Sequence, residues 1–246
     1  MMLYFEEYGN PELTTLVFIH GLATSSWVWW KQTEYFDNYH IILIDLPGHG
    51  GSQDVPWISL KDTFHQIKHQ IIRDKSVHMI GASLGGHVTL DFAKYYPENL
   101  LSAYISGITV KPMKGKWLMP LIKQYYIHML NQEKTLQKMI KDYNIPPEKH
   151  ADFKDNAQKL STNSVSKIGL EIMSFNFDLT YEHILTPIKI VCGEKETDTI
   201  KQSLSVIPQT IPSASSEIIP NAEHQWPIQQ SPLFNQKIKE WLEIHS

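Results

Sequence analysis

The chain has 246 residues, of which 42% are hydrophobic and 20% are charged, as is usual for a folded globular protein. Its formal net charge of −4 gives no overall attraction toward nucleic acid or anionic membranes. It has no run of about 18 apolar residues, and its acidic start does not resemble a secretory signal. Since Cys192 is the only cysteine, no internal disulfide can form. We expect a cytoplasmic protein that binds no nucleic acid and does not insert stably into a membrane.

Short runs rich in β-branched residues alternate along the chain with segments of helical periodicity. This alternation is typical of an α/β fold, in which a mostly parallel sheet carries helices on both faces. The expected strands, starting with an antiparallel edge strand, are Leu3–Tyr8, Thr15–Ile19, Ile41–Ile44, Val77–Ile80, Leu101–Ile108, Ile188–Cys192 and Glu217–Ile219. Ser59 and Ser231 are expected to begin helices, the first with a capping-box-like sequence and the second followed by proline.

The stretch from 111 to 183 breaks this alternation, because its patterns are mostly helical and a simple crossover needs only one helix. We therefore predict a core formed by residues 1–110 and 184–246, with residues 111–183 inserted as a helical cap. The insertion holds five of the eight methionines, together with Trp117, Tyr125 and Tyr126. Methionine adapts its shape to irregular apolar surfaces, so we expect the underside of the cap to form a deformable apolar wall over a site.

The sequence Gly-Ala-Ser-Leu-Gly at 81–85 directly follows one expected strand and precedes a helical pattern. A serine on such a sharp turn is pushed above the sheet edge, where a base can reach its hydroxyl. The N–H of Leu84 then lies at a helix N-terminus and can stabilise developing negative charge. The turn after the first buried strand can aim the N–H of Leu22 at the same point. We therefore predict Ser83 as a nucleophile and the Leu22 and Leu84 N–H groups as its oxyanion hole.

A serine nucleophile needs a base and an acid that orients the base. In α/β folds that carry the serine on a sharp turn between a strand and a helix, these residues follow in the chain order serine, acid, histidine. His224 lies between the last expected strand and the terminal helix, where the base is expected. The loop after Ile188–Cys192 offers Glu194, Glu196 and Asp198 as acids. Glu194 is too close to the strand, so Glu196 is the first choice and Asp198 is the alternative.

These segments together resemble the α/β-hydrolase superfamily, in particular its lidded members among small esterases and lipases. The resemblance is carried by residues 20–21, 26–27, 45–52, 81–86, 193–196 and 223–224, which are spread over nearly all of the chain outside the insertion. It implies an α/β-hydrolase fold with a helical cap and an intact triad of serine, acid and histidine. Members commonly have aspartate at the position of Glu196, so Glu196 and Asp198 both remain candidates.

The predicted function is that of a carboxylesterase-like serine hydrolase acting on small to medium esters with apolar acyl groups. His224 would take the proton as Ser83 attacks the ester carbonyl, and water would then release the acid product. The expected partner is thus a small-molecule ester. No metal or organic cofactor is needed, and no cluster of cysteine and histidine has the spacing of metal ligands.

Two other functions are compatible with these residues, because a fold does not fix a reaction. One is a lyase or C–C hydrolase that uses the same triad. Arg73 is the only arginine, which argues against a site that grips anionic substrates in this way. The other is a signalling protein that retains the triad but works by binding a small molecule. Steady turnover of simple esters would distinguish an esterase from a signalling protein.

Overall fold

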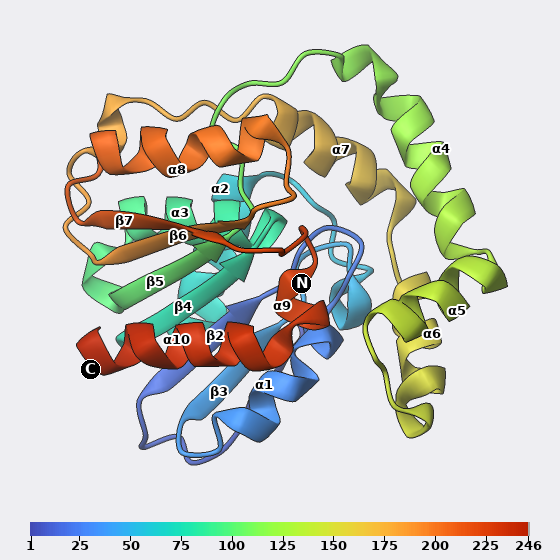
Figure 1. Cartoon of the computed structure of the whole chain (residues 1–246), viewed down its shortest axis with the longest axis horizontal. Helices are drawn as coiled ribbons and strands as arrows, with labels where there is room; N and C mark the ends of the chain where they lie inside the picture. Colours follow the sequence, from blue (N-terminus) through green and yellow to red (C-terminus); the bar gives the residue numbers. More distant parts are fainter. Residues whose placement is uncertain (246) are drawn as a thin grey trace.

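The computed structural model of the chain describes residues 1–245 without the side chain of Tyr126, so the last residue of the predicted core range, Ser246, lies outside the described residues. Seven strands form one sheet in the order β1-β3-β2-β4-β5-β6-β7 (Figure 1). Only β1 runs antiparallel to its neighbour, β3. The strands are β1 (Phe5–Tyr8), β2 (Thr15–Ile19), β3 (His40–Ile44), β4 (Val77–Ala82), β5 (Leu100–Ser106), β6 (Ile188–Gly193) and β7 (Ala214–Ile219). The predicted α/β fold with a mostly parallel sheet is confirmed.

Several strand boundaries differ from the expected ones by one to three residues, and two of these differences have a clear physical reason. β5 ends at Ser106 rather than Ile108, because Gly107 has a φ of 70°, which an extended strand does not tolerate. β7 begins at Ala214 rather than Glu217, and its first residues are small or polar and partly exposed. Backbone pairing with β6 extends β7 where the side chains give no strand pattern, since Ala214 lies opposite Ile188.

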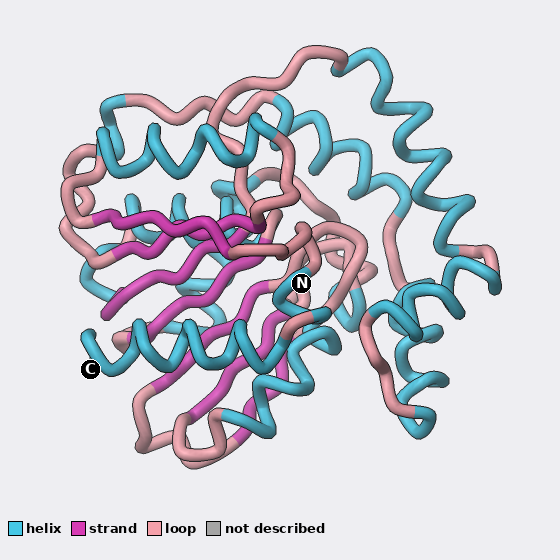
Figure 2. Tube along the Cα trace, viewed as in Figure 1, coloured by secondary structure: helices cyan, strands magenta, loops and turns pink. Residues whose placement is uncertain are grey.

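Helices cover both faces of the sheet (Figures 1 and 2). Alternate residues of β2 show the division: Val17 and Ile19 pack in the core beneath α2, α3 and α8, whereas Leu16 and Phe18 pack with residues of α10. Strands buried on both faces in this way have continuous apolar sequences. The helices are α1 (Trp30–Tyr35), α2 (Leu60–Gln66), α3 (Leu84–Tyr95), α4 (Met119–Leu130), α5 (Glu133–Asp142), α6 (His150–Gln158), α7 (Thr162–Met173), α8 (Asp198–Thr210), α9 (Trp226–Gln229) and α10 (Ser231–His245).

Ser59 caps α2 as expected, since its hydroxyl accepts a hydrogen bond from the N–H of Asp62 at 3.0 Å. The helix then continues as a π-helix from Ile67 to Ile72 and ends at Arg73, whose φ is 55°. Arg73 is exposed at this end of the helix, opposite the edge at which the nucleophile turn lies. Among residues 1–245, no helix is long and apolar enough to cross a membrane.

The chain between β5 and β6 contains α4, α5, α6 and α7, which lie beyond one end of the sheet (Figure 1). Its later part is joined to the loop after β3 by backbone hydrogen bonds. The N–H of Gly50 donates to the carbonyl of Lys159 at 2.9 Å, and the N–H of Ser161 donates to the carbonyl of Gly48 at 2.8 Å. On α7, the carboxylate of Glu171 accepts from the N–H of Leu60 at 2.8 Å. These bonds fasten α6 and α7 to the rest of the molecule.

Asp91 on α3 is a buried carboxyl group that accepts a hydrogen bond from the Tyr181 hydroxyl at 2.6 Å. Burial outweighs that bond and raises the pKa of Asp91 to about 6. Between about pH 4 and pH 6 the folded protein therefore keeps a proton that the unfolded chain has released. Ionisation of Asp91 thus lowers the free energy of unfolding as the pH rises through this range.

We expect Asp91→Asn to relieve this cost, because asparagine still offers Tyr181 an acceptor but never ionises. Relative to the wild type, the variant should gain about 2 kcal/mol more in stability at pH 7 than at pH 4. Urea denaturation of both proteins at the two pH values measures this difference. Buried histidines also make the wild type pH-dependent, but their effect is common to both proteins. A gain that is the same at pH 4 and pH 7 would contradict the assignment.

Candidate active site

Ser83 occupies the turn between β4 and α3 with a φ of 54° and a ψ of −113°. This conformation is strained for a residue with a side chain, and such strain is typical of a nucleophile turn. Other backbone atoms approach this turn so closely that glycine is required on either side of Ser83. An added Cβ on Gly81 would lie 2.4 Å from the carbonyl oxygen of Gly85. One on Gly85 would lie 2.2 Å from the carbonyl oxygen of Ile19 on β2. The two glycines thus allow the turn to pack tightly against the end of β2.

Backbone hydrogen bonds hold the turn to the strands on both sides. The N–H of Ser83 donates to the carbonyl of Ser106 at the end of β5, at 2.8 Å. The N–H of Gly85 donates to the carbonyl of His20 just after β2, at 3.0 Å. Ser83 is therefore fixed at the carboxyl ends of three adjacent strands, which is where sites of parallel sheets form.

His224 lies in the loop after β7 and is bonded to Glu196 from the loop after β6. Its Nδ1–H donates to Oε2 of Glu196 at 2.6 Å, and the glutamate side chain is only 1% exposed. The other carboxylate oxygen accepts from the N–H of Gly193 at 3.1 Å. Because Nδ1 carries the proton that Glu196 accepts, Nε2 of His224 is left free to accept one. The imidazole itself is 38% exposed and lines the same cavity as Ser83.

The other two acids considered for this role lie elsewhere. Asp198 is the first residue of α8 and is exposed, and within residues 1–245 no bond joins it to His224. Glu194 accepts from the N–H of Asn221 at 2.8 Å and so stabilises the turn after β7. The structure thus brings Glu196, and neither Asp198 nor Glu194, to the candidate base.

Gly107 is a residue of the site that the sequence patterns did not single out. It follows β5 with a φ of 70°, and an added Cβ would lie 2.9 Å from Cε1 of His224. The same Cβ would lie 3.3 Å from Oε1 of Glu196. Glycine is therefore needed here to make room for the histidine and the carboxylate. The sequence pattern placed Gly107 inside the expected strand Leu101–Ile108, so a glycine near the end of that strand was its only signal.

The two predicted oxyanion donors flank Ser83. Leu84 is the first residue of α3, and Leu22 lies in the turn after β2. That turn packs directly on the serine, since an added Cβ on Gly21 would lie 3.3 Å from Cβ of Ser83. In the described part of the chain, no hydrogen-bond acceptor is paired with the N–H of Leu22 or of Leu84. Both groups are therefore available to an anionic oxygen.

Three other histidines near the turn form hydrogen bonds with backbone groups. Nδ1–H of His20 donates to the carbonyl of Gly21 at 2.7 Å, while its Nε2 accepts from the N–H of Leu46 at 3.0 Å. Burial lowers the pKa of His20 to about 4 and that of His49 to about 3. His87 is also buried, within 2.8 Å of the carbonyl oxygen of Thr109. These residues support the loops around Ser83 and remain neutral at physiological pH.

Two cavities adjoin Ser83, and Leu22 also lines both of them. The smaller, of about 140 Å³, contains His224 together with residues of the loop after β2 and the start of α9. The larger, of about 280 Å³, is bounded mainly by apolar side chains from the segment between β5 and β6. Those side chains are Met113, Met119, Ile122, Val165, Ile168, Ile172 and Met173. Trp117 and Tyr125, which were considered for such a wall, are instead exposed on the outside.

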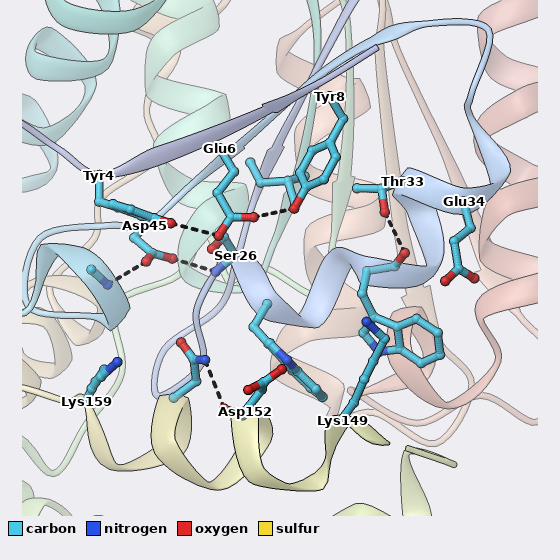
Figure 3. A pocket seen from close by; sticks show the side chains of 15 residues that line it. Tyr4, Glu6, Tyr8, Ser26, Thr33, Glu34, Asp45, Lys149, Asp152 and Lys159 are labelled. Atoms are coloured by element: carbon cyan, nitrogen blue, oxygen red, sulfur yellow. Dashed lines mark hydrogen bonds between the residues drawn. The ribbon is translucent and has the colours of Figure 1, made fainter. Parts of the chain in front are cut away.

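A larger cavity, of about 470 Å³, lies elsewhere, between β1, α1 and α6 (Figure 3). The carboxylate of Glu6 accepts hydrogen bonds there from the hydroxyls of Tyr4, at 3.0 Å, and Tyr8, at 2.5 Å. The carboxylate of Asp45 accepts from two backbone N–H groups. None of its lining residues adjoins Ser83, and it brings together no serine and histidine. We therefore take the neighbourhood of Ser83 as the candidate site. Within residues 1–245, no group of three potential ligands is arranged to hold a metal ion.

The chain is similar to known proteins of the α/β-hydrolase fold. The family model described as alpha/beta hydrolase fold matches residues 14–127. An AB hydrolase superfamily protein of Gibberella zeae is 33% identical over 43% of this chain and 39% of its own length. The monoacylglycerol lipase ABHD6 of Mus musculus is 22% identical over 88% of this chain and 72% of its own. A 2-succinyl-6-hydroxy-2,4-cyclohexadiene-1-carboxylate synthase of Escherichia coli is 30% identical over 41% of each chain. The chain thus spans about two fifths of the first and third of these relatives.

Solved structures resemble the whole chain. An esterase from Exiguobacterium antarcticum has a TM-score of 0.80 at 14% identity, covering 98% of this chain and 95% of its own. A thermophilic esterase from Thermogutta terrifontis has a TM-score of 0.74 at 20% identity, covering 99% and 94%. At these identities the likeness concerns the fold, which agrees with the family model and with the turn that carries Ser83. The chain therefore has the α/β-hydrolase fold.

Proposed function

We propose that this protein is a serine hydrolase that cleaves carboxylic esters with small to medium apolar acyl groups. The observation that carries the proposal is the 2.6 Å hydrogen bond from His224 to the buried Glu196, in a site whose cavity also holds Ser83. A histidine held in this tautomer beside a serine on a strained turn is the arrangement that activates a hydroxyl nucleophile. Steady-state turnover of p-nitrophenyl esters, with Ser83→Ala as control, tests it.

In the proposed mechanism, Nε2 of His224 takes the proton of the Ser83 hydroxyl as its oxygen attacks the ester carbonyl. The N–H groups of Leu22 and Leu84 stabilise the negative charge on the carbonyl oxygen. Glu196 stabilises the imidazolium, which then gives its proton to the departing alcohol. Water, deprotonated by His224, attacks the acyl-enzyme, and the acid product leaves with Ser83 restored.

We further propose that residues 111–183 act as the cap of a core formed by residues 1–110 and 184–246. Support comes from the 280 Å³ cavity, because most of its lining belongs to this segment while Ser83 lies at its base. An apolar cavity favours acyl chains over charged groups, which would lose their hydration there without a partner. The methionines in the wall can adapt to chains of different shape.

Ile172→Phe tests the role of this cavity. The added ring should fill space next to Ser83, so esters with long acyl chains should lose about tenfold or more in kcat/KM relative to acetate. The measurement is kcat/KM for p-nitrophenyl acetate, butyrate and octanoate. Leu170→Phe is the matched control, because Leu170 lies on the same helix but is exposed and does not line the cavity. An unchanged ratio of octanoate to acetate in Ile172→Phe would rule out this cavity as the acyl site.

The likeness to the synthase favours a second candidate, a triad-dependent lyase or C–C hydrolase. The name of that relative includes a carboxylate, and a carboxylate substrate would need a cationic partner near Ser83. Neither cavity at Ser83 is lined by a lysine or an arginine. Ester hydrolysis therefore fits the site better. A chain that binds fluorophosphonate at Ser83 but turns over no ester would favour the lyase or a signalling protein.

A further inference from the structure

The outer side of the segment between β5 and β6 carries a stripe of exposed apolar side chains. Trp117 is 79% exposed, Leu121 66% and Tyr125 64%. Trp117 lies in the turn that leads into α4, and the other two follow at intervals of four residues on that helix. Residues spaced by four lie on the same side of a helix. We call these three residues the α4 stripe. Single exposed apolar residues are common, but three on one face form a patch that marks an interaction surface.

Other residues of α4 pack the helix against the protein, since Met119 and Ile122 line the cavity at Ser83 together with residues of α7. In Figure 1, α4 lies at the edge of the molecule, far from α8 and α10. The helix therefore has one apolar side turned toward the protein and a second turned outward.

Basic residues accompany the stripe. Lys111, Lys114 and Lys116 precede it closely and are all exposed. No aspartate or glutamate occurs from residue 99 to residue 132. The segment 111–183 carries eleven lysines and eight acidic residues, whereas the rest of the chain carries eleven basic and eighteen acidic residues. The net charge of −4 therefore hides a local excess of positive charge where the apolar stripe is exposed.

We propose that the α4 stripe and the three lysines dock the protein reversibly on an anionic lipid surface. Tryptophan and tyrosine prefer the boundary between headgroups and acyl chains, and lysines are attracted to anionic headgroups. A helix with an apolar side and adjacent basic residues lies in the plane of such a surface. This docking requires no spanning helix and does not rest on the proposed hydrolysis.

Vesicle co-sedimentation tests the docking, with phosphatidylcholine alone or mixed with phosphatidylserine. The wild type should bind the mixed vesicles, and added salt should weaken the binding. Reversing the charge of Lys111, Lys114 and Lys116 to glutamate should lower the affinity by about a hundredfold or more, since each lysine contributes roughly fivefold. The double variant Trp117→Ser, Leu121→Ser should also release the protein. Blue-shifted emission that the wild type shows and Trp117→Phe lacks would place Trp117 in the lipid.

Matched variants test whether this surface, and not charge or hydrophobicity in general, is responsible for vesicle binding. Exposed lysines outside the segment, changed together as Lys61→Glu, Lys75→Glu and Lys239→Glu, should leave binding nearly unaltered. The same holds for Leu185→Ser with Ile244→Ser, two other exposed apolar residues. All variants should keep the urea midpoint of the wild type, which verifies their folding.

Ser83→Ala should bind vesicles normally, so loss of docking and loss of hydrolysis can be told apart. Equal binding to both vesicle types, or no binding to either, would overturn the proposal. So would a stripe variant that abolishes self-association, measured by light scattering without lipid, while vesicle binding stays unchanged.

Discussion

Replacing Ser83 with alanine is expected to lower kcat for p-nitrophenyl butyrate by about 10⁴-fold or more. The expected loss is large because the variant lacks the hydroxyl that would form the acyl-enzyme. His224→Ala should lose a similar factor, and the double variant little more, since the two residues act as one unit. Steady-state kinetics with the purified variants measures these effects.

Folding and labelling provide the controls for this result. Both single variants should unfold at nearly the same urea concentration as the wild type, because replacing a partly exposed polar residue usually changes stability only slightly. A fluorophosphonate probe should label the wild type at Ser83 and leave Ser83→Ala unlabelled. If Ser83→Ala is folded, unlabelled and still turns over the ester at the rate of the wild type, another residue is the nucleophile.

Glu196→Gln is expected to lower kcat by about 10³- to 10⁴-fold while leaving the fold intact. The amide can still accept from the N–H of Gly193, but its NH₂ group would donate to Nδ1 of His224. That contact selects the tautomer with the proton on Nε2, so the base can no longer accept the proton of Ser83. In serine proteases the corresponding change of acid to amide costs about 10⁴-fold in kcat.

Asp198→Asn is the matched control, because it removes the other candidate carboxylate by the same change. Asp198 is exposed at the start of α8, and its loss should leave kcat near that of the wild type. Collapse of activity in Asp198→Asn, with normal activity in Glu196→Gln, would show that the assignment of the acid is reversed. The Ser83→Ala kinetics would remain valid in either case.

The features that were predicted well from the sequence are those specified by local patterns. A buried parallel strand such as β2 needs a continuous apolar run, and the turn at Ser83 needs its two glycines, so both are visible in a few adjacent residues. The burial of Cys192 could be predicted in the same way, because it lies in a continuous apolar run. In the structure it is fully buried. The positions expected for His224 and Glu196 also followed from the order of the strands, because parallel strands end at one edge.

The features that were missed depend on contacts between distant segments. Gly107 must lack a side chain because His224 and Glu196, far along the chain, occupy the space beside it. Similarly, tryptophan is a residue type expected in the interior of a cap, but Trp117 is exposed on the outside. The direction in which a side chain faces depends on its position around the helix axis and not on its residue type. Net charge is a sum over the chain and contains no information about position, so it did not show the excess of lysines over acidic residues in segment 111–183.

The backbone bonds that join residues 48–50 to residues 159–161 have a consequence for how ligands reach and leave the serine. A rigid swing of the whole helical segment would break both bonds and leave four polar backbone groups without partners, which carries a high energetic cost. The N–H of Met113 also donates to the carbonyl of Met173 at 2.9 Å, so the segment is held at its start as well. Entry and release are therefore expected to depend on smaller movements of side chains within the segment rather than on its opening as one body.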